Sequence, residues 1–228
     1  MSARILIVDD HPFMRAGLAL VIGRQPDMTV VGEAGDSDEA LRMLAESPVD
    51  LLLADVSMPG RTGFEFVREL REHYPNIAVL VVSMHDEMLY AQRMMHVGAR
   101  GYIMKAAGVD QMLVAIRRVL AGDIYLSTAV SDRVLEDLVG RSQRGASSGS
   151  PLAKLTDREF EIFQLIGRGQ NTRAIAAQLS LSPKTFDVHR GHIREKLGLE
   201  NAAAVVHAAA RWFESAGKAD ETTLKPPV

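Results

Sequence analysis

The stretch Arg4-Ile5-Leu6-Ile7-Val8-Asp9-Asp10 decides the fold, because an unbroken apolar run closes on two carboxylates. A second run of the same form, Leu51-Leu52-Leu53-Ala54, closes on Asp55. Such runs are typical of strands covered on both faces, as in a parallel sheet. Parallel sheets bind ligands beyond the carboxyl ends of their strands, so the three carboxylates should meet in one crevice. Because like charges repel, the cluster needs a proton or a cation, and oxygen ligands with room for water favour Mg²⁺.

The first half of the chain repeats this pattern. Further apolar runs end near Ala34, Val82 and Met104, and helical spacing fills the stretches between the runs. The predicted helices cover residues 12–22, 37–46, 63–72, 87–96 and 109–121. Five strands that alternate with five helices predict a doubly wound α/β domain over residues 1–122.

The second half has a different organisation. A short amphipathic piece, residues 129–139, and a stretch rich in Ser and Gly, residues 141–151, together predict a linker over 123–151. Capping signals then predict four helices in residues 152–213: a capping box at 156–159, and caps at Asn171, Ser182 and Asn201. The short link between the second and third helices indicates a helix-turn-helix. Residues 214–228 are polar, and we expect them to be disordered.

Composition limits the possible functions. The 228 residues include no Cys, which excludes disulfides, thiolate metal sites and Cys nucleophiles. The longest uncharged apolar run, residues 77–84, is too short to span a bilayer, and the N-terminus lacks a signal peptide, so we expect a cytoplasmic protein with no membrane contact. Acidic residues prevail in 1–126 and basic residues slightly in 151–212, which favours nucleic-acid binding by the second half alone.

Four motifs in the first half resemble the receiver domain of bacterial two-component response regulators. They are Asp9-Asp10-His11-Pro12, Asp55-Val56-Ser57-Met58-Pro59-Gly60, Ser83-Met84-His85-Asp86-Glu87 and Gly101-Tyr102-Ile103-Met104-Lys105. The resemblance covers about residues 1–122. It implies a flavodoxin-like sheet with the strand order 2-1-3-4-5.

The resemblance also implies roles for single residues. Asp55 would accept a phosphoryl group from a histidine kinase. Asp10, Asp55 and the backbone carbonyl of Ser57 would hold Mg²⁺, and Asp9 would contribute through water. The chemistry fits, because phosphoryl transfer chiefly requires positioning and neutralisation of charge.

Three further residues complete the implied site. Lys105 would pair with the phosphoryl oxygens, and the Ser83 hydroxyl would donate a hydrogen bond to one of them. Tyr102 stands at the position of the family's switch aromatic, and Ser83 and Tyr102 together would form the switch that responds to phosphorylation. An alternative interpretation makes Tyr102 a half-buried strand residue with its hydroxyl in water.

Motifs in the second half resemble the LuxR-type helix-turn-helix domain. They are Leu155-Thr156-Asp157-Arg158-Glu159, Ile175-Ala176-Ala177-Gln178-Leu179, Ser182-Pro183-Lys184-Thr185, Val188-His189 and Glu195-Lys196-Leu197-Gly198-Leu199. Joined to a receiver, such a domain is identified with the NarL/FixJ subfamily. The resemblance implies binding to promoter DNA. Phe160 departs from the usual polar residue at its position, and either another domain or the local structure should cover it.

The third helix of this domain can be interpreted from its periodicity. Its inward face comprises Phe186, His189, Arg190, Ile193 and Leu197. The N-terminal part of a recognition helix reaches the base edges, which makes Lys184, Asp187, Val188 and Gly191 the candidates for base contacts. Candidates for phosphate contacts are Thr185, Arg190 and Arg194. For each of these residues the alternative is a solvated helix position.

The fourth helix has few polar side chains after its cap, essentially His207 and Arg211. Packing on one domain buries one stripe of a helix, so apolar surface should remain on the other side. We therefore expect a homodimer contact through Ala203, Val206 and Ala210.

Taken together, the residues and the resemblance predict a two-domain response regulator that is not an enzyme. Phosphorylation would promote dimerisation and promoter binding. One alternative is a Mg²⁺-dependent phosphohydrolase of flavodoxin-like topology with an aspartyl nucleophile; the sequence offers it no second acid or base near Asp55. Another alternative is a binding module that is never phosphorylated, which the complete set of pocket residues disfavours.

Overall fold

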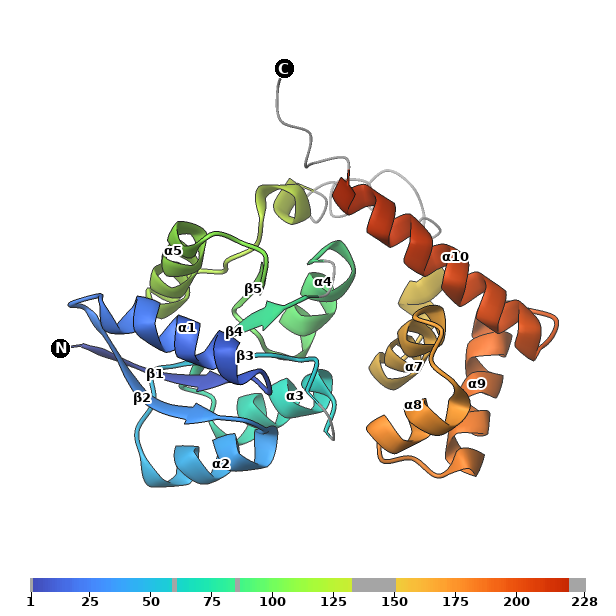
Figure 1. The fold of residues 1–228 in the computed structure, drawn as a ribbon, viewed down its shortest axis with the longest axis horizontal. Helices are drawn as coiled ribbons and strands as arrows, with labels where there is room; N and C mark the ends of the chain where they lie inside the picture. The colour runs from blue at the N-terminus through green and yellow to red at the C-terminus, as the bar shows by residue number, and fades with distance from the viewer. Residues whose placement is uncertain (1, 59–60, 85–86, 133–150, 222–228) are drawn as a thin grey trace, which may run out of the picture. The chain divides into compact units, whose positions relative to one another are not determined.

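The computed structural model describes residues 2–58, 61–84, 87–132 and 151–221. The chain forms two compact units, Met1–Gln143 and Arg144–Val228 (Figure 1). The predicted linker centre and the Pro59-Gly60 turn lie outside the described residues. The domain boundaries at residues 122 and 151 stay predictions.

The first unit is built on one parallel sheet with the strand order β2-β1-β3-β4-β5, which confirms the flavodoxin-like prediction. The strands are β1 (Ala3–Val8), β2 (Met28–Ala34), β3 (Leu51–Ala54), β4 (Ala78–Ser83) and β5 (Gly101–Met104). The helices between them are α1 (Pro12–Gly23), α2 (Ser37–Glu46), α3 (Gly63–His73), α4 (Glu87–Val97) and α5 (Val109–Leu120).

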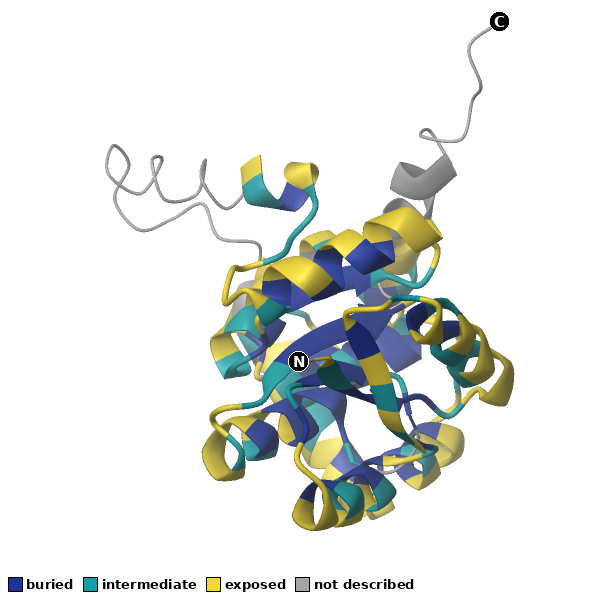
Figure 2. Ribbon diagram, turned by 90° about the vertical axis from the view of Figure 1, so that its left-hand side faces the viewer, coloured by how far each residue is buried: buried dark blue, intermediate teal, exposed yellow. Residues whose placement is uncertain are grey.

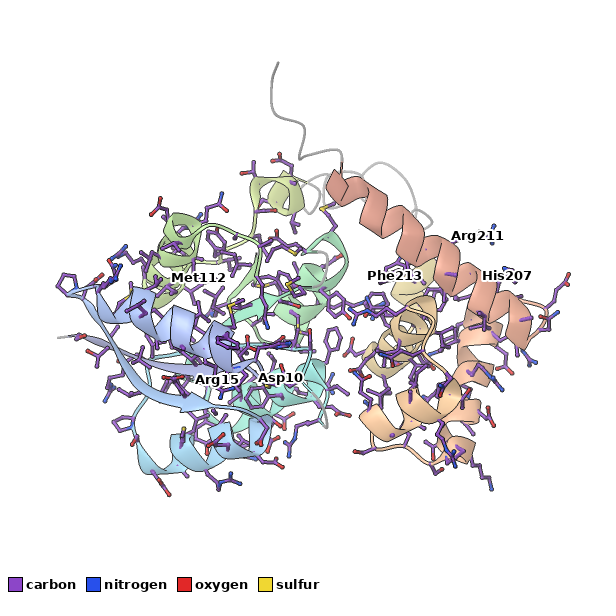
Figure 3. All side chains as sticks on the ribbon, in the orientation of Figure 1. Asp10, Arg15, Met112, His207, Arg211 and Phe213 are labelled. Atoms are coloured by element: carbon purple, nitrogen blue, oxygen red, sulfur yellow. The ribbon has the colours of Figure 1, made fainter. Side chains whose placement is uncertain are left out.

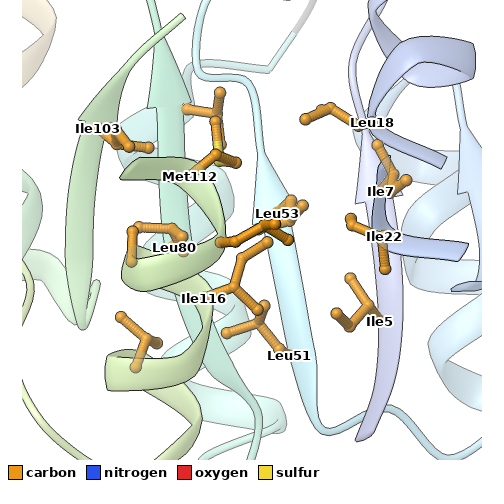
Figure 4. Close-up of a cluster of buried hydrophobic side chains, with 14 of the residues drawn as sticks. Ile5, Ile7, Leu18, Ile22, Leu51, Leu53, Leu80, Ile103, Met112 and Ile116 are labelled. Atoms are coloured by element: carbon orange, nitrogen blue, oxygen red, sulfur yellow. The ribbon is translucent and has the colours of Figure 1, made fainter. Parts of the chain in front are cut away.

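The two faces of the sheet are both covered, as the apolar runs require. Side chains alternate across a strand, so Ile5 and Ile7 enter one layer of the core and Leu6 enters the other. The layer with Ile5 and Ile7 packs against α1 and α5 (Figure 4), while α2, α3 and α4 cover the opposite face (Figure 1). The central strands β3 and β4 are buried almost throughout, the edge strand β2 is partly exposed, and the outer sides of the helices are exposed (Figure 2).

The loop after Asp55 is held close to the start of α3. Thr62 and Glu65 form a capping box there, which the sequence reading missed. Gly63 follows, and a Cβ atom on it would lie 2.3 Å from the Val56 side chain. A larger residue at 63 would push this loop away from the sheet edge. Packing of Gly63 against Val56 and the capping box of α3 therefore hold the described part of this loop near the carboxylates.

The chain packs on the sheet again after α5. Tyr125 lies beside β5 as an isolated parallel bridge: the Tyr102 N–H donates to the Tyr125 carbonyl at 3.0 Å, and the Tyr125 N–H donates to Arg100 at 3.1 Å. The Ser127 N–H donates to the Glu87 carboxylate on α4 at 2.7 Å. A helical segment begins at residue 128, and its Val130 is buried. The first part of the predicted linker thus belongs structurally to the first unit.

The second unit contains a 3-10 turn, η1 (Pro151–Lys154), and the helices α7 (Asp157–Gly167), α8 (Thr172–Gln178), α9 (Pro183–Lys196) and α10 (Ala202–Glu221). The predicted caps are confirmed at Thr156, Asn171, Ser182 and Asn201. Between α8 and α9 the chain turns at Ser180, whose φ is 53°. This is the predicted helix-turn-helix.

The core of the second unit combines aliphatic side chains with several aromatic rings. Phe160 is 2% exposed, and its ring meets Trp212 edge-on with centroids 5.9 Å apart. Residues of the second unit itself therefore cover Phe160. The alternative that another domain covers this ring is not needed. α10 continues to Glu221, so the prediction that the chain is disordered from residue 214 is wrong for 214–221. Those residues extend the helix; residues 222–228 lie outside the described part.

Candidate functional site

Two buried carboxylates meet at the carboxyl edge of the sheet, as predicted. Asp9 follows β1 and Asp55 follows the neighbouring strand β3, and they are 2% and 1% exposed. The Lys105 Nζ atom, from the end of β5, lies 2.7 Å from Asp9 Oδ2 and 2.7 Å from Asp55 Oδ2. Its ammonium group therefore supplies positive charge between them.

Lys105 is held in place by the sheet. Its backbone N–H donates to the Ser83 carbonyl at 2.7 Å, which fixes the end of β5 against the end of β4. Burial by itself lowers the pKa of Lys105, but the carboxylates of Asp55 and Asp9 outweigh this effect, and the pKa is raised above 10.5. Lys105 is therefore charged at neutral pH.

The carboxylate oxygens have different partners. Asp55 Oδ1 accepts from the Ser57 N–H at 2.8 Å, and Asp9 Oδ1 accepts from the His11 N–H at 2.8 Å. Asp9 Oδ2 and Asp10 Oδ1 are buried, and their nearest nitrogens, Lys105 Nζ and His11 Nδ1, each lie 2.7 Å away. Three carboxylates gather around the single Lys105 ammonium group, so like charges remain close together. A cation bound among these carboxylates would offset the remaining charge.

Oxygen donors from Asp9, Asp10 and Asp55 lie within 4.8 Å of one another, together with a His11 ring nitrogen. Carboxylates of this kind fit Mg²⁺. The predicted ligand role of the Ser57 carbonyl stays a prediction.

Two residues of the pocket were missed in the sequence reading. His11 was quoted only as part of a motif, but its Nδ1 atom lies 2.7 Å from Asp10 Oδ1 and 3.2 Å from Asp9 Oδ1. Arg15, one helical turn along α1, donates from Nη1 to the backbone carbonyl of Asp9 (Figure 3). The spacing of Arg15 from Asp9 was the available signal, because a residue at the first turn of α1 can reach back over the strand end.

The proposed switch residues are both buried. Ser83 ends β4 and is 0% exposed, and Tyr102 in β5 is also 0% exposed. The alternative of a half-buried Tyr102 with its hydroxyl in water is therefore wrong. Tyr102 also connects to the segment after α5, because its N–H donates to Tyr125.

The outer side of α9 carries the candidate DNA contacts. Lys184, Thr185, Asp187, Val188 and Arg194 are exposed, and Arg190 and Gly191 are partly exposed. Phe186 and Ile193 are buried, as the periodicity predicts. Asp187 and Arg190 form an ion pair at 2.7 Å in the free protein. Contacts from either side chain to DNA would have to replace that pair.

A second polar cluster joins α9 to α7. Glu159 is 2% exposed, and its Oε2 atom accepts from Lys196 Nζ at 2.6 Å and from the Thr156 N–H at 2.7 Å. Burial raises the pKa of Glu159, but these hydrogen bonds outweigh burial and leave the pKa below 4.5. On the same flank, burial and the nearby Arg158 lower the pKa of His189. This flank fixes α9 to the rest of the unit.

The predicted dimer residues lie on the outer side of α10. Ala203 and Val206 are exposed and Ala210 is partly exposed, whereas Val205 and Ala209 are buried against the unit. His207 and Arg211 also project from this helix (Figure 3). Among the described residues, no helix is long and apolar enough to cross a membrane.

Comparisons with known proteins agree with this division. A family model described as the response regulator receiver domain matches residues 5–117, and one described as bacterial regulatory proteins, luxR family, matches residues 153–209. The oxygen regulatory protein NreC of Staphylococcus aureus strain MRSA252 is 36% identical over 208 residues, covering 90% of this chain and 96% of that protein.

Solved structures are similar as well. A LuxR-family two-component response regulator from Aurantimonas sp. SI85-9A1 is 34% identical, with a TM-score of 0.57, and covers 61% of this chain and 99% of its own. RcsB from Salmonella enterica serovar Typhimurium, bound to promoter rprA in the presence of the phosphomimetic BeF3-, is 23% identical with a TM-score of 0.66. The similarity to RcsB covers 92% of this chain and 99% of that protein, and at this identity it supports the fold alone.

Proposed function

Because the chain belongs to the two-component response regulators of the NarL/FixJ subfamily, which carry a LuxR-type DNA-binding domain, we propose that phosphorylation of Asp55 controls its binding to promoter DNA. It is a transcription regulator, and the phosphohydrolase alternative is rejected. The observation that carries the proposal is the 2.7 Å contact between Lys105 Nζ and Asp55 Oδ2 beside the carboxylates of Asp9 and Asp10.

The geometry favours Asp55 as the nucleophile. An Asp55 carboxylate oxygen forms the new bond to phosphorus as the bond to the kinase histidine breaks. The Ser57 N–H holds Oδ1 and Lys105 holds Oδ2, so the carboxylate is oriented before the reaction. Such preorganised charge lowers the barrier, because it is already in place where negative charge develops.

Asp9, Asp10 and Asp55 would hold Mg²⁺, which when bound offsets charge on the transferring phosphoryl group. Lys105 turns from Asp55 Oδ2 toward the phosphoryl oxygens after transfer. Ser83 stands beside it, because its backbone carbonyl accepts from the Lys105 N–H. Phosphorylation adds about −1.5 to −2 charge at this point, enough to bias a two-state loop.

A connection leads from the switch to the segment beyond α5. Ser83 precedes the loop that enters α4, and Glu87 in the first turn of α4 accepts from the Ser127 N–H. Tyr102 reaches the same segment through Tyr125. A shift of this loop would therefore move the contact from Glu87, whereas the contact from Tyr102 follows β5. Residues 125–127 lead into the second unit.

The second unit would bind DNA through the exposed side of α9, with bases read by Lys184, Asp187, Val188 and Gly191. Thr185, Arg190 and Arg194 would hold phosphates. Two copies would associate through Ala203, Val206 and Ala210 after phosphorylation. A cognate histidine kinase supplies the phosphoryl group.

Chemical phosphorylation tests the proposal. Phosphoramidate with Mg²⁺ should label wild-type protein on Asp55, and Asp55→Asn should abolish the label. Asp110→Asn, an exposed carboxylate in the first turn of α5, is the matched control and should be labelled like wild type. Undiminished labelling of Asp55→Asn at another residue would contradict the assignment.

A further inference from the structure

We propose that Glu159, His189 and His192 form a second metal site, suited to Zn²⁺, on the inner flank of the recognition helix. One ligand atom from each residue lies within 4.8 Å of the other two. The site is in the second unit and shares no residue with the acidic pocket of the first.

The positions of the ligands follow from the helices. His189 and His192 are three residues apart on α9 and therefore share one side of that helix. Glu159 lies at the N-terminus of α7, and its Oε1 atom is 3.6 Å from His192 Nδ1. Zinc bonds of about 2.0–2.1 Å in a tetrahedron place neighbouring ligand atoms about 3.4 Å apart. The separation between Glu159 and His192 is close to this requirement, and the ligand atom of His189 lies within 4.8 Å of both.

His189 has an uncommitted nitrogen. Its Nδ1 atom is buried and has no hydrogen-bond partner among the described residues. A buried nitrogen without a partner destabilises the folded state, and a metal bound at this nitrogen would remove that penalty. Imidazole ligates metals in its neutral form.

Glu159 is already oriented for ligation through one oxygen. Lys196 and the Thr156 N–H both bond Oε2, so Oε1 is the atom left for a metal. Ligating carboxylates are commonly held in this way by hydrogen bonds from other groups. Lys196 and Arg158 are also cationic, and their charge opposes a divalent ion. The affinity should therefore be lower than in a site without them.

The ligand set decides which metal fits. Two imidazoles and one carboxylate favour zinc over magnesium or calcium, which prefer oxygen ligands. The His192 side chain is 54% exposed, which gives an ion a way in and leaves room for a water as fourth ligand. A bound metal would tie α9 to α7 and so stabilise the helix that carries the DNA contacts.

Zinc titration of the full-length protein tests the site. His11 lies in the acidic pocket and could bind zinc there. All proteins therefore carry His11→Asn, and all titrations are made in saturating Mg²⁺. Calorimetry should show one equivalent of Zn²⁺ that is lost in His192→Ala. His207→Ala removes an exposed histidine from α10 of the same unit and should leave the binding unchanged.

Thermal unfolding gives a second readout, because Trp212 is the only tryptophan and lies in the second unit. Zinc should raise the midpoint reported by Trp212 fluorescence in the His11→Asn background, and EDTA should reverse the shift. His192→Ala should show no shift. Equal zinc stoichiometry and affinity with and without His192, or no zinc binding in the His11→Asn protein, would overturn the proposal.

Discussion

Lys105 is the only described cation that lies between the two buried carboxylates of the sheet edge. Lys105→Met would leave Asp9 and Asp55 buried without their counter-ion. We expect the free energy of unfolding in EDTA to fall by about 3–5 kcal/mol. Removing one partner of a buried ion pair leaves the other charge buried without compensation. Bound Mg²⁺ should recover part of this loss.

Urea unfolding followed by circular dichroism, with EDTA and with Mg²⁺, measures both effects. Arg100→Met, which changes an exposed cation of the same unit, is the control. A Lys105→Met protein as stable as wild type in EDTA would contradict the role of this ammonium group.

Glu159 predicts a pH dependence in the second unit. Its folded pKa lies below 4.5, so its contribution to stability is fully present above the unfolded value and is lost as pH falls through the folded value. Relative to Glu159→Gln, wild type should be more stable at pH 7 by on the order of 2 kcal/mol. This advantage should disappear in the acid range.

Trp212 fluorescence follows the unfolding of this unit at each pH. Glu195→Gln removes a carboxylate from α9 whose side chain is 68% exposed, and should leave the curve unchanged. An advantage of wild type over Glu159→Gln that persisted at pH 2 would show that charge is not its cause.

At the scale of elements, α9 separates base recognition from phosphate contact. Val188 is 49% exposed and apolar, so it suits contact with a thymine methyl group. Val188→Ala should relax preference at one base position by at most about 1–3 kcal/mol. Arg190→Ala should weaken all sequences alike and reduce the salt dependence.

Competition binding against a randomised site library separates the two effects. Val114→Ala changes a valine of similar exposure, 50%, on α5 of the first unit, and serves as the control for base preference. If Val188→Ala left the preference unaltered at every position, another side of α9 would face the bases.

Glu87 joins α4 to the segment beyond α5. Glu87→Gln keeps the shape of the side chain but weakens the acceptor for the Ser127 N–H. Hydrogen exchange at Ser127 and Tyr125 should therefore become faster, while exchange in β3 stays unchanged. Glu72→Gln, an exposed carboxylate of α3, is the control. Unchanged exchange at Ser127 would mean that this bond does not hold the segment.

Local signals explain what the sequence could predict at this scale. The apolar runs placed Asp9 and Asp55 at strand ends, and Ser182 marked the start of α9, because strand burial and helix caps depend on nearby residues. The pairing of Tyr125 with β5 and the bond from Glu87 to Ser127 were not predicted. Both join residues far apart in the chain, and neither has a local pattern.

The whole molecule should change its association state on phosphorylation. Val206 is 48% exposed on α10, and Val206→Glu places a charge in the proposed dimer contact. In sedimentation with a beryllofluoride phosphomimetic, wild type should shift toward dimer and Val206→Glu should shift less. Glu200→Gln, exposed just before α10, is the control. A monomeric wild type under these conditions would refute association as the switch.

The pairing of Tyr125 with β5 also bears on where the chain can be divided. A fragment that stopped at residue 122 would leave the outer side of β5 bare, and bare strand edges recruit strands from other copies. A fragment that continued through residue 132 would retain Tyr125, Ser127 and the buried Val130. Resistance of the isolated first unit to aggregation therefore depends on residues 123–132, which lie just beyond the shorter fragment.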